Sequence, residues 1–279
     1  MEVRDRLVAK RLDGHAVYPL SEVHYKETWK QRDPRRRSEL AVEMALLSNF
    51  ITLAPPRSTW PQELDLALYR RYGRPTLSND FRVFGRGISF AVGEEEPSDV
   101  GMLDLESRFL LEWQALRSPD EGHWKVERLA RTDKDGRLAD DASAMSRALR
   151  EWHASPRERE QHLRIQTLVG LDYAFLQRLI LADVTPDDVA AMGGEGLEDL
   201  VSDVPTLWVL AELRRLRHQN PGQRFTSNDL NDLRALAVAV VYCDVVIADK
   251  AWVHFLKRTD LPERFGTVVS ADPALAAAS

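Results

Sequence analysis

Apolar and polar residues follow a helical spacing over most of the chain, with short apolar runs of strand type near both ends. Residues 3–12 carry apolar side chains close to helical spacing, and Gly14 follows as a natural stop, so a short helix is predicted there. The apolar run AVYPL, residues 16–20, predicts a strand. It ends at Ser21, whose hydroxyl can cap a second helix that begins with SEVHYKETW.

A second strand is predicted after two helices. The basic stretch KQRDPRRR interrupts the helical pattern at Pro34, and SELAVEMALLSN restores it. Residues 50–54 are apolar or β-branched, and Pro55 and Pro56 end the run. The first part of the chain therefore predicts the order helix, strand, two helices, strand.

The C-terminal part returns to alternating helices and strands. A helical pattern runs through residue 218, and TSNDLNDLRALAVAVVYC predicts a further helix capped by Ser227 or Asn228. DVVIAD is a continuous apolar run bounded by acids, which is typical of a parallel strand covered on both faces. KAWVHFLKR then predicts a helix, and GTVVS predicts a last short strand.

The order of these elements predicts the fold class. Strands and helices that alternate at both ends indicate an α/β fold with a three-layer α/β/α parallel sheet. Between them the composition shifts to Leu, Ala, Arg and Glu with helical periodicity. We therefore expect residues 1–56 and 203–279 to form an α/β core, and residues 57–202 to form a large, mainly helical insertion.

Composition and charge narrow the possible partners and the compartment. Of the 279 residues, 44% are hydrophobic and 29% are charged, as expected for a folded protein. The net charge of −6 means that a nucleic-acid partner must meet a local basic patch. The single cysteine, Cys243, excludes an intramolecular disulfide and fits the cytoplasm. No apolar run approaches the roughly 20 residues that span a bilayer, so we expect no membrane segment.

Four carboxylates stand out as candidates for chemistry. They begin helices or follow a predicted strand, and the carboxyl ends of parallel strands are where ligands bind in open sheets. Clustered carboxylates repel one another unless a cation neutralises them, and Mg²⁺ or Mn²⁺ prefers oxygen ligands. A metal-bound water can then attack a phosphodiester. The candidates are Glu27, Asp229, Asp232 and Asp249.

Two segments resemble PIN-domain nucleases. NDLNDLRALAVAVVYCDVVIADK, residues 228–250, is similar to the late helix and strand of that family, where one acid opens the helix and another follows the strand. AVYPLSEVHYKET resembles the strand and helix whose glutamate is a metal ligand, which corresponds to Glu27. The resemblance implies that Glu27, Asp232 and Asp249 bind the metal. It also implies that Asp229 is an additional ligand or orients water.

The resemblance implies a metal-dependent endoribonuclease, and it leaves alternatives open. PIN domains usually begin with a strand that ends in aspartate, whereas here Met1 is followed almost at once by a helix. Either the true start lies upstream, or another residue substitutes, or the site is degenerate. In the last case the protein binds without cutting, and residues 57–202 dock a partner protein. A phosphatase with similar ligands is a third, weaker alternative.

Several of these residues also have structural interpretations. Glu27 and Asp232 lie in the first turns of helices, where acids are favoured whatever their function. Trp252 falls on an apolar helix face and is expected in the core. Cys243 is expected to be buried and inert, and His24 more often packs than contacts a phosphate. The basic residues near 30–37 and 214–217 either hold a phosphate backbone or form solvated helix faces.

Overall fold

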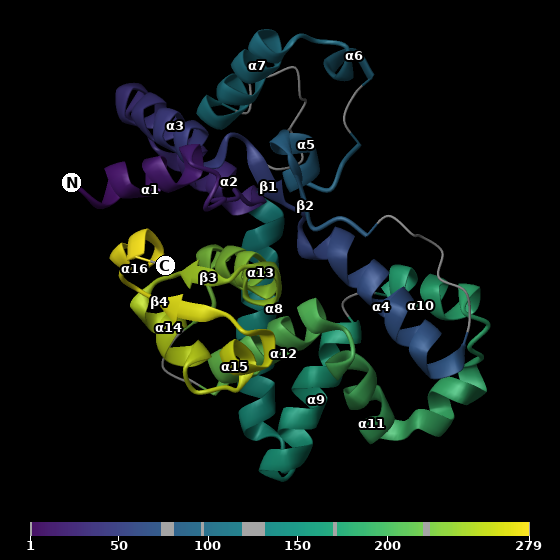
Figure 1. Ribbon diagram of the computed structural model, residues 1–279. Coiled ribbons are helices and arrows are strands. Elements are labelled where there is room, and N and C mark those ends of the chain that lie inside the picture. Colours follow the sequence, from purple (N-terminus) through teal and green to yellow (C-terminus); the bar gives the residue numbers. More distant parts are fainter. Residues whose placement is uncertain are drawn as a thin grey trace. The chain divides into compact units, whose positions relative to one another are not determined.

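The computed structural model shows a mainly helical protein (Figure 1). It describes residues 2–73, 81–95, 98–118, 132–169, 172–219 and 224–278. In this part of the chain the strands are three residues long and form two sheets of two strands each. The predicted three-layer α/β/α parallel sheet is therefore wrong. Among the same residues, no helix combines the length and the apolar character needed to cross a bilayer.

The predicted strand segments exist only as short pieces. β1 (Ile51–Leu53) pairs with β2 (Phe84–Arg86) in antiparallel orientation, and the AVYPL run contributes one parallel bridge, from Leu20 to Thr52. β3 (Val245–Ile247) pairs with β4 (Val268–Ser270).

The reason for the failed prediction lies in the burial of β3. A central parallel strand must be covered on both faces. In β3 only Val246 is buried, and Ile247 is 40% exposed. An apolar run in the sequence therefore did not mean a strand covered on both faces.

The chain divides into two compact units. The first contains Met1–Pro55, Arg82–Asp135 and Ser270–Ser279, and the second contains Pro56–Phe81 and Gly136–Val269. Residues 203–269, which the sequence pattern places with the first 56 residues, thus belong to the second unit. They share it with most of the helices of the expected insertion.

The first unit is built around a small helical core. Its fully buried residues include Tyr25 of α2 and Leu116 of α7, which pack with Phe50 and Ile88. The predicted first helix is confirmed, because α1 spans the predicted residues. α3 begins at Pro34, where the pattern was predicted to break, and Asp33 caps it. The helices are α1 (Val3–Leu12), α2 (Glu22–Lys30), α3 (Pro34–Ser48), α5 (Gly87–Ala91), α6 (Ser98–Gly101), α7 (Leu105–Arg117) and α16 (Ala274–Ala278).

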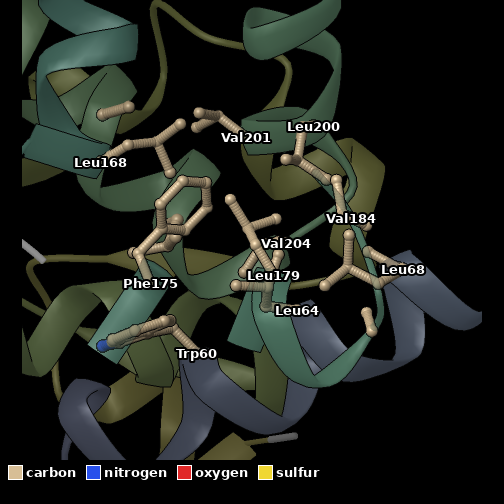
Figure 2. Packing of buried hydrophobic residues seen from close by; sticks show 14 residues of the cluster. Trp60, Leu64, Leu68, Leu168, Phe175, Leu179, Val184, Leu200, Val201 and Val204 are labelled. Atoms are coloured by element: carbon tan, nitrogen blue, oxygen red, sulfur yellow. The ribbon is translucent and has the colours of Figure 1, made fainter. Parts of the chain in front are cut away.

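The second unit is organised around α12 (Pro205–His218), which packs against α4, α9, α11 and α13. Its core has two hydrophobic clusters. Figure 2 shows the first cluster, in which Trp60 and Leu64 of α4 lie near Phe175 and Leu179 of α10. The other elements are α4 (Pro56–Tyr72), most of α8 (Thr132–Glu151), α9 (Pro156–Val169), α10 (Asp172–Leu181), α11 (Pro186–Ser202), α13 (Ser227–Tyr242), α14 (Lys250–Leu256), α15 (Leu261–Phe265), β3 and most of β4.

A buried carboxylate fixes α13 against α4 and α12. Glu63 of α4 is 3% exposed and accepts hydrogen bonds from the backbone N–H of Thr206 at 2.8 Å and from its hydroxyl at 2.6 Å. The Tyr242 hydroxyl donates a third bond at 2.5 Å. Burial raises the pKa of Glu63, and these bonds partly offset the rise. The helix that carries two of the candidate acids is thus held at its C-terminal end.

Candidate functional site

Asp232 and Asp249 are each connected with the start of α14 in the second unit. Asp232, on α13, accepts a hydrogen bond from the indole N–H of Trp252 at 2.9 Å. Trp252 is 5% exposed and lies in the first turn of α14, the helix that Asp249 precedes as N-cap. Asp232 is thus bonded to the first turn of the helix whose N-cap is Asp249.

The Asp249 carboxylate is exposed where β3 leads into α14. Its backbone carbonyl accepts the first helical hydrogen bond, from Val253 at 2.9 Å, but its side chain makes no capping bond. No described residue donates a hydrogen bond to this carboxylate. Because it is exposed and unpaired within the described ranges, it is available to a cation.

Asp229 has a different environment. It belongs to a capping box at the start of α13, where it accepts bonds from the Thr226 N–H and hydroxyl, each at 2.8 Å. It also accepts two bonds from Arg217. Burial by itself raises the pKa of Asp229, but these bonds outweigh it and the net pKa is lowered. The carboxylate oxygens of Asp229 thus already accept hydrogen bonds from other protein groups. The helix cap is Thr226, whereas Ser227 or Asn228 was predicted.

Glu27 lies on α2, in the first unit, whereas the three aspartates lie in the second. Its side chain is 45% exposed and forms an ion pair with Lys30, with 2.5 Å between Oε1 and Nζ. Such exposed pairs of residues three apart on a helix contribute little stability. Its expected role as a metal ligand stays a prediction.

Within the ranges that the structure describes, no three His, Cys, Asp or Glu side chains are gathered in a way that would hold a metal ion. Asp232 is bonded to the first turn of α14 and Asp249 is its N-cap, but among the described residues they do not belong to a centre of three ligands. Mg²⁺ is commonly held by only one or two carboxylates plus water and substrate phosphates, so the residues present fit this kind of ion.

Trp252, Cys243 and His24 have mainly structural environments. Trp252 is buried as predicted, but its hydrogen bond to Asp232 was not foreseen. Burial, together with the charge of Asp244, raises the pKa of the Cys243 thiol to about 11, which agrees with an unreactive cysteine. His24 acts locally: its Nδ1 accepts the backbone N–H of Ser21 at 2.9 Å at the start of α2.

The basic run of α12 is largely used within the protein. Arg215 pairs with Glu212 at 2.8 Å and with Glu160 at 3.2 Å, and Arg217 pairs with Asp229. Arg214 is different, because burial lowers its pKa and no described carboxylate forms an ion pair with it. This run is therefore mostly a structural network rather than an open surface for a phosphate backbone.

Comparison of the chain with protein-family models, with curated proteins and with solved structures finds no match in any of the three.

Proposed function

We propose that this protein is a metal-dependent hydrolase of phosphodiester bonds in which Asp232 and Asp249 bind Mg²⁺ or Mn²⁺. The observation that carries the proposal is the Trp252 hydrogen bond, which ties the Asp232 carboxylate to the first turn of α14, the helix whose N-cap is Asp249. Hydrogen bonds of this kind orient metal ligands and tune their basicity. RNA as the substrate, and the cytoplasm as the compartment, follow from the resemblance to PIN nucleases and from the single cysteine.

The chemistry needs few protein groups. Asp232 and Asp249 would hold the divalent ion, and the ion would supply an activated water for hydrolysis of the phosphodiester. A bound ion would also offset the repulsion between the two carboxylates and the phosphate. Asp229 supports the start of α13 in this proposal and is not a ligand. Glu27 is a candidate third ligand only because of the resemblance to PIN-domain nucleases, and the Glu27→Gln variant tests it.

The test uses a matched pair of aspartates. Asp249 and Asp260 are both exposed N-cap residues without side-chain capping bonds, at the starts of α14 and α15. Five proteins are incubated with labelled single-stranded RNA and DNA, in the presence of Mn²⁺ or of EDTA. They are wild type, Asp232→Asn, Asp249→Asn, Glu27→Gln and the control Asp260→Asn. Loss of an outer hydrogen bond costs about 10–100-fold in metal affinity or activity, so we expect losses of at least about 100-fold when a ligand itself is removed.

Metal binding is measured independently of cleavage. An ion that binds only the native state raises the melting temperature, so Mn²⁺ should stabilise wild type and Asp260→Asn but not Asp232→Asn or Asp249→Asn. Equal Mn²⁺ stabilisation and equal cleavage in all variants would exclude the proposed site. Phosphomonoesters tested beside the oligonucleotides separate a nuclease from a phosphatase.

A second candidate function is that of a binding or regulatory protein without catalysis. α10, within the expected insertion, exposes three apolar side chains: Leu176 is 56%, Ile180 72% and Leu181 49% accessible. Contiguous exposed apolar residues often mark a protein interface. A chain with neither Mn²⁺ stabilisation nor cleavage would favour this function.

A further inference from the structure

A pocket in the second unit, away from Asp232 and Asp249 in the sequence, combines an apolar wall with polar groups. It has a volume of about 280 Å³ and is bordered by α8, the start of α9 and the C-terminal end of α12. Leu149, Pro156 and Leu163 form its apolar wall. Small-ligand sites usually measure about 300–1,000 Å³, so this one suits a ligand of metabolite size.

His218 supplies a hydrogen-bond acceptor in this pocket. It is 9% exposed, and its Nδ1 lies 2.6 Å from the Ser146 hydroxyl oxygen. The Ser146 hydroxyl has one proton and donates it to the backbone carbonyl of Ala142 at 3.1 Å. The Ser146–Ala142 and Ser146–His218 contacts are both hydrogen bonds if Nδ1 of His218 carries the ring proton and donates it to the Ser146 oxygen. In that tautomer Nε2 of His218 has no proton, and its lone pair can accept a hydrogen bond. No described residue hydrogen-bonds to Nε2.

The protonation state of His218 agrees with this assignment. Burial, reinforced by the positive charges of Arg214 and Arg217, lowers its pKa to about 4. At neutral pH the imidazole is therefore uncharged and keeps one acceptor nitrogen. The pocket wall here accepts a hydrogen bond and does not offer a second donor.

Arg159 gives the pocket a positive charge. Its guanidinium forms no ion pair with any carboxylate in the described ranges, although it lines the pocket. The neighbouring carboxylate of Glu160 is already engaged, by Arg215 at 3.2 Å and by the Gln219 amide at 3.1 Å. With Glu160 paired and Arg159 available, the pocket favours an anion.

We propose that this pocket binds a small carboxylate that carries a hydroxyl group and a short apolar side chain. Its carboxylate pairs with Arg159, its hydroxyl donates to Nε2 of His218, and its apolar part packs on Leu149 and Leu163. This site is independent of the proposed metal centre, because it uses neither Asp232 nor Asp249. A ligand in this pocket would contact α8, α9 and α12, so we expect it to stabilise the second unit.

Three related probes test each part of the proposal. Mandelate has the carboxylate, the hydroxyl and an apolar ring, phenylacetate lacks the hydroxyl, and mandelamide lacks the charge. Binding is measured by calorimetry and by the shift in melting temperature of the full chain. A single hydrogen bond to a buried partner is worth roughly tenfold in affinity, so we expect phenylacetate and mandelamide each to bind at least about tenfold more weakly than mandelate.

Two arginines of α9 provide a matched pair of variants. Arg159→Gln removes the charge inside the pocket, whereas Arg157→Gln removes the same charge from an exposed residue that pairs with Glu195. We expect Arg159→Gln to reduce mandelate binding at least about tenfold and Arg157→Gln to leave it unchanged. Failure of all three probes to bind at millimolar concentration, or equal mandelate binding by both variants, overturns the proposal. Asp232→Asn should bind mandelate like wild type, which separates this site from the metal centre.

Discussion

The guanidinium of Arg217 donates two hydrogen bonds to the carboxylate of Asp229, from Nε at 3.2 Å and from Nη2 at 3.1 Å. Arg217 is 4% exposed, so the pair is largely removed from water. The same carboxylate completes the capping box of α13 with Thr226. Asp229 therefore connects the C-terminal end of α12 to the start of α13.

Asp229→Asn should reduce stability without removing the metal response. The substitution leaves the Arg217 charge without its partner and weakens the cap, and we expect a loss of about 1–3 kcal/mol in unfolding free energy. Urea denaturation measures it, with the exposed Asp260→Asn as control. A variant as stable as wild type that loses Mn²⁺-dependent cleavage would restore Asp229 as a candidate ligand.

Trp252→Phe should weaken metal binding while leaving the fold intact. The phenyl ring still fills most of the buried site, but Asp232 loses the N–H that orients it. We expect a decrease of about 10–100-fold in Mn²⁺ affinity. Trp208→Phe is the matched control, because the indole N–H of Trp208 has no hydrogen-bond partner among the described groups. Equal Mn²⁺ titration curves for the two variants would argue against a role for Trp252 at a metal centre.

Gly87→Ala should destabilise the first unit strongly. Gly87 has a φ of +82°, and an added Cβ would lie 2.1 Å from Oε1 of Glu112. That carboxylate is buried and accepts the Ile88 N–H at 2.9 Å, so it cannot move without losing a bond. We expect a loss of at least about 2 kcal/mol by thermal denaturation.

Gly14→Ala separates the two causes of that loss. Gly14 has a similar φ of +73°, but no atom lies within 4 Å of an added Cβ. Backbone strain alone should then cost about 1 kcal/mol. Equal losses for the two variants would mean that the contact with Glu112 contributes nothing.

Stability should fall as the pH decreases from about 6.5 towards 4, because of His218. Its pKa in the folded protein is about 4, against 6.5 for an ordinary histidine, so over this range the unfolded chain binds the proton more readily. We expect the buried neutral imidazole to account for a loss on the order of 1–3 kcal/mol.

Urea denaturation at neutral pH and near pH 4.5 checks this pH dependence. His218→Gln should show a shallower decrease than wild type, and the exposed His254→Gln should follow wild type. Parallel curves for wild type and His218→Gln would show that the folded pKa of His218 is not depressed.

The sequence by itself determined several helices and some of their ends. The α1 boundaries, the break in the pattern at Pro34 and the course of α12 to His218 were all predicted. These features depend on residues three or four apart in the chain, and side chains at that spacing contact each other in any helix. The positions of β1, β3 and β4 were predictable for the same local reason, but not their shortness.

Only the tertiary structure decided how these segments pair and which acids have partners. Strand pairing depends on residues far apart in sequence, and Ile247 stays partly exposed where a covered strand was expected. Asp229 and Asp232 lie three residues apart on one helix, yet one accepts bonds from Arg217 and the other from Trp252. Those partners come from other helices, and packing brings them into contact, so no local pattern could distinguish the two aspartates.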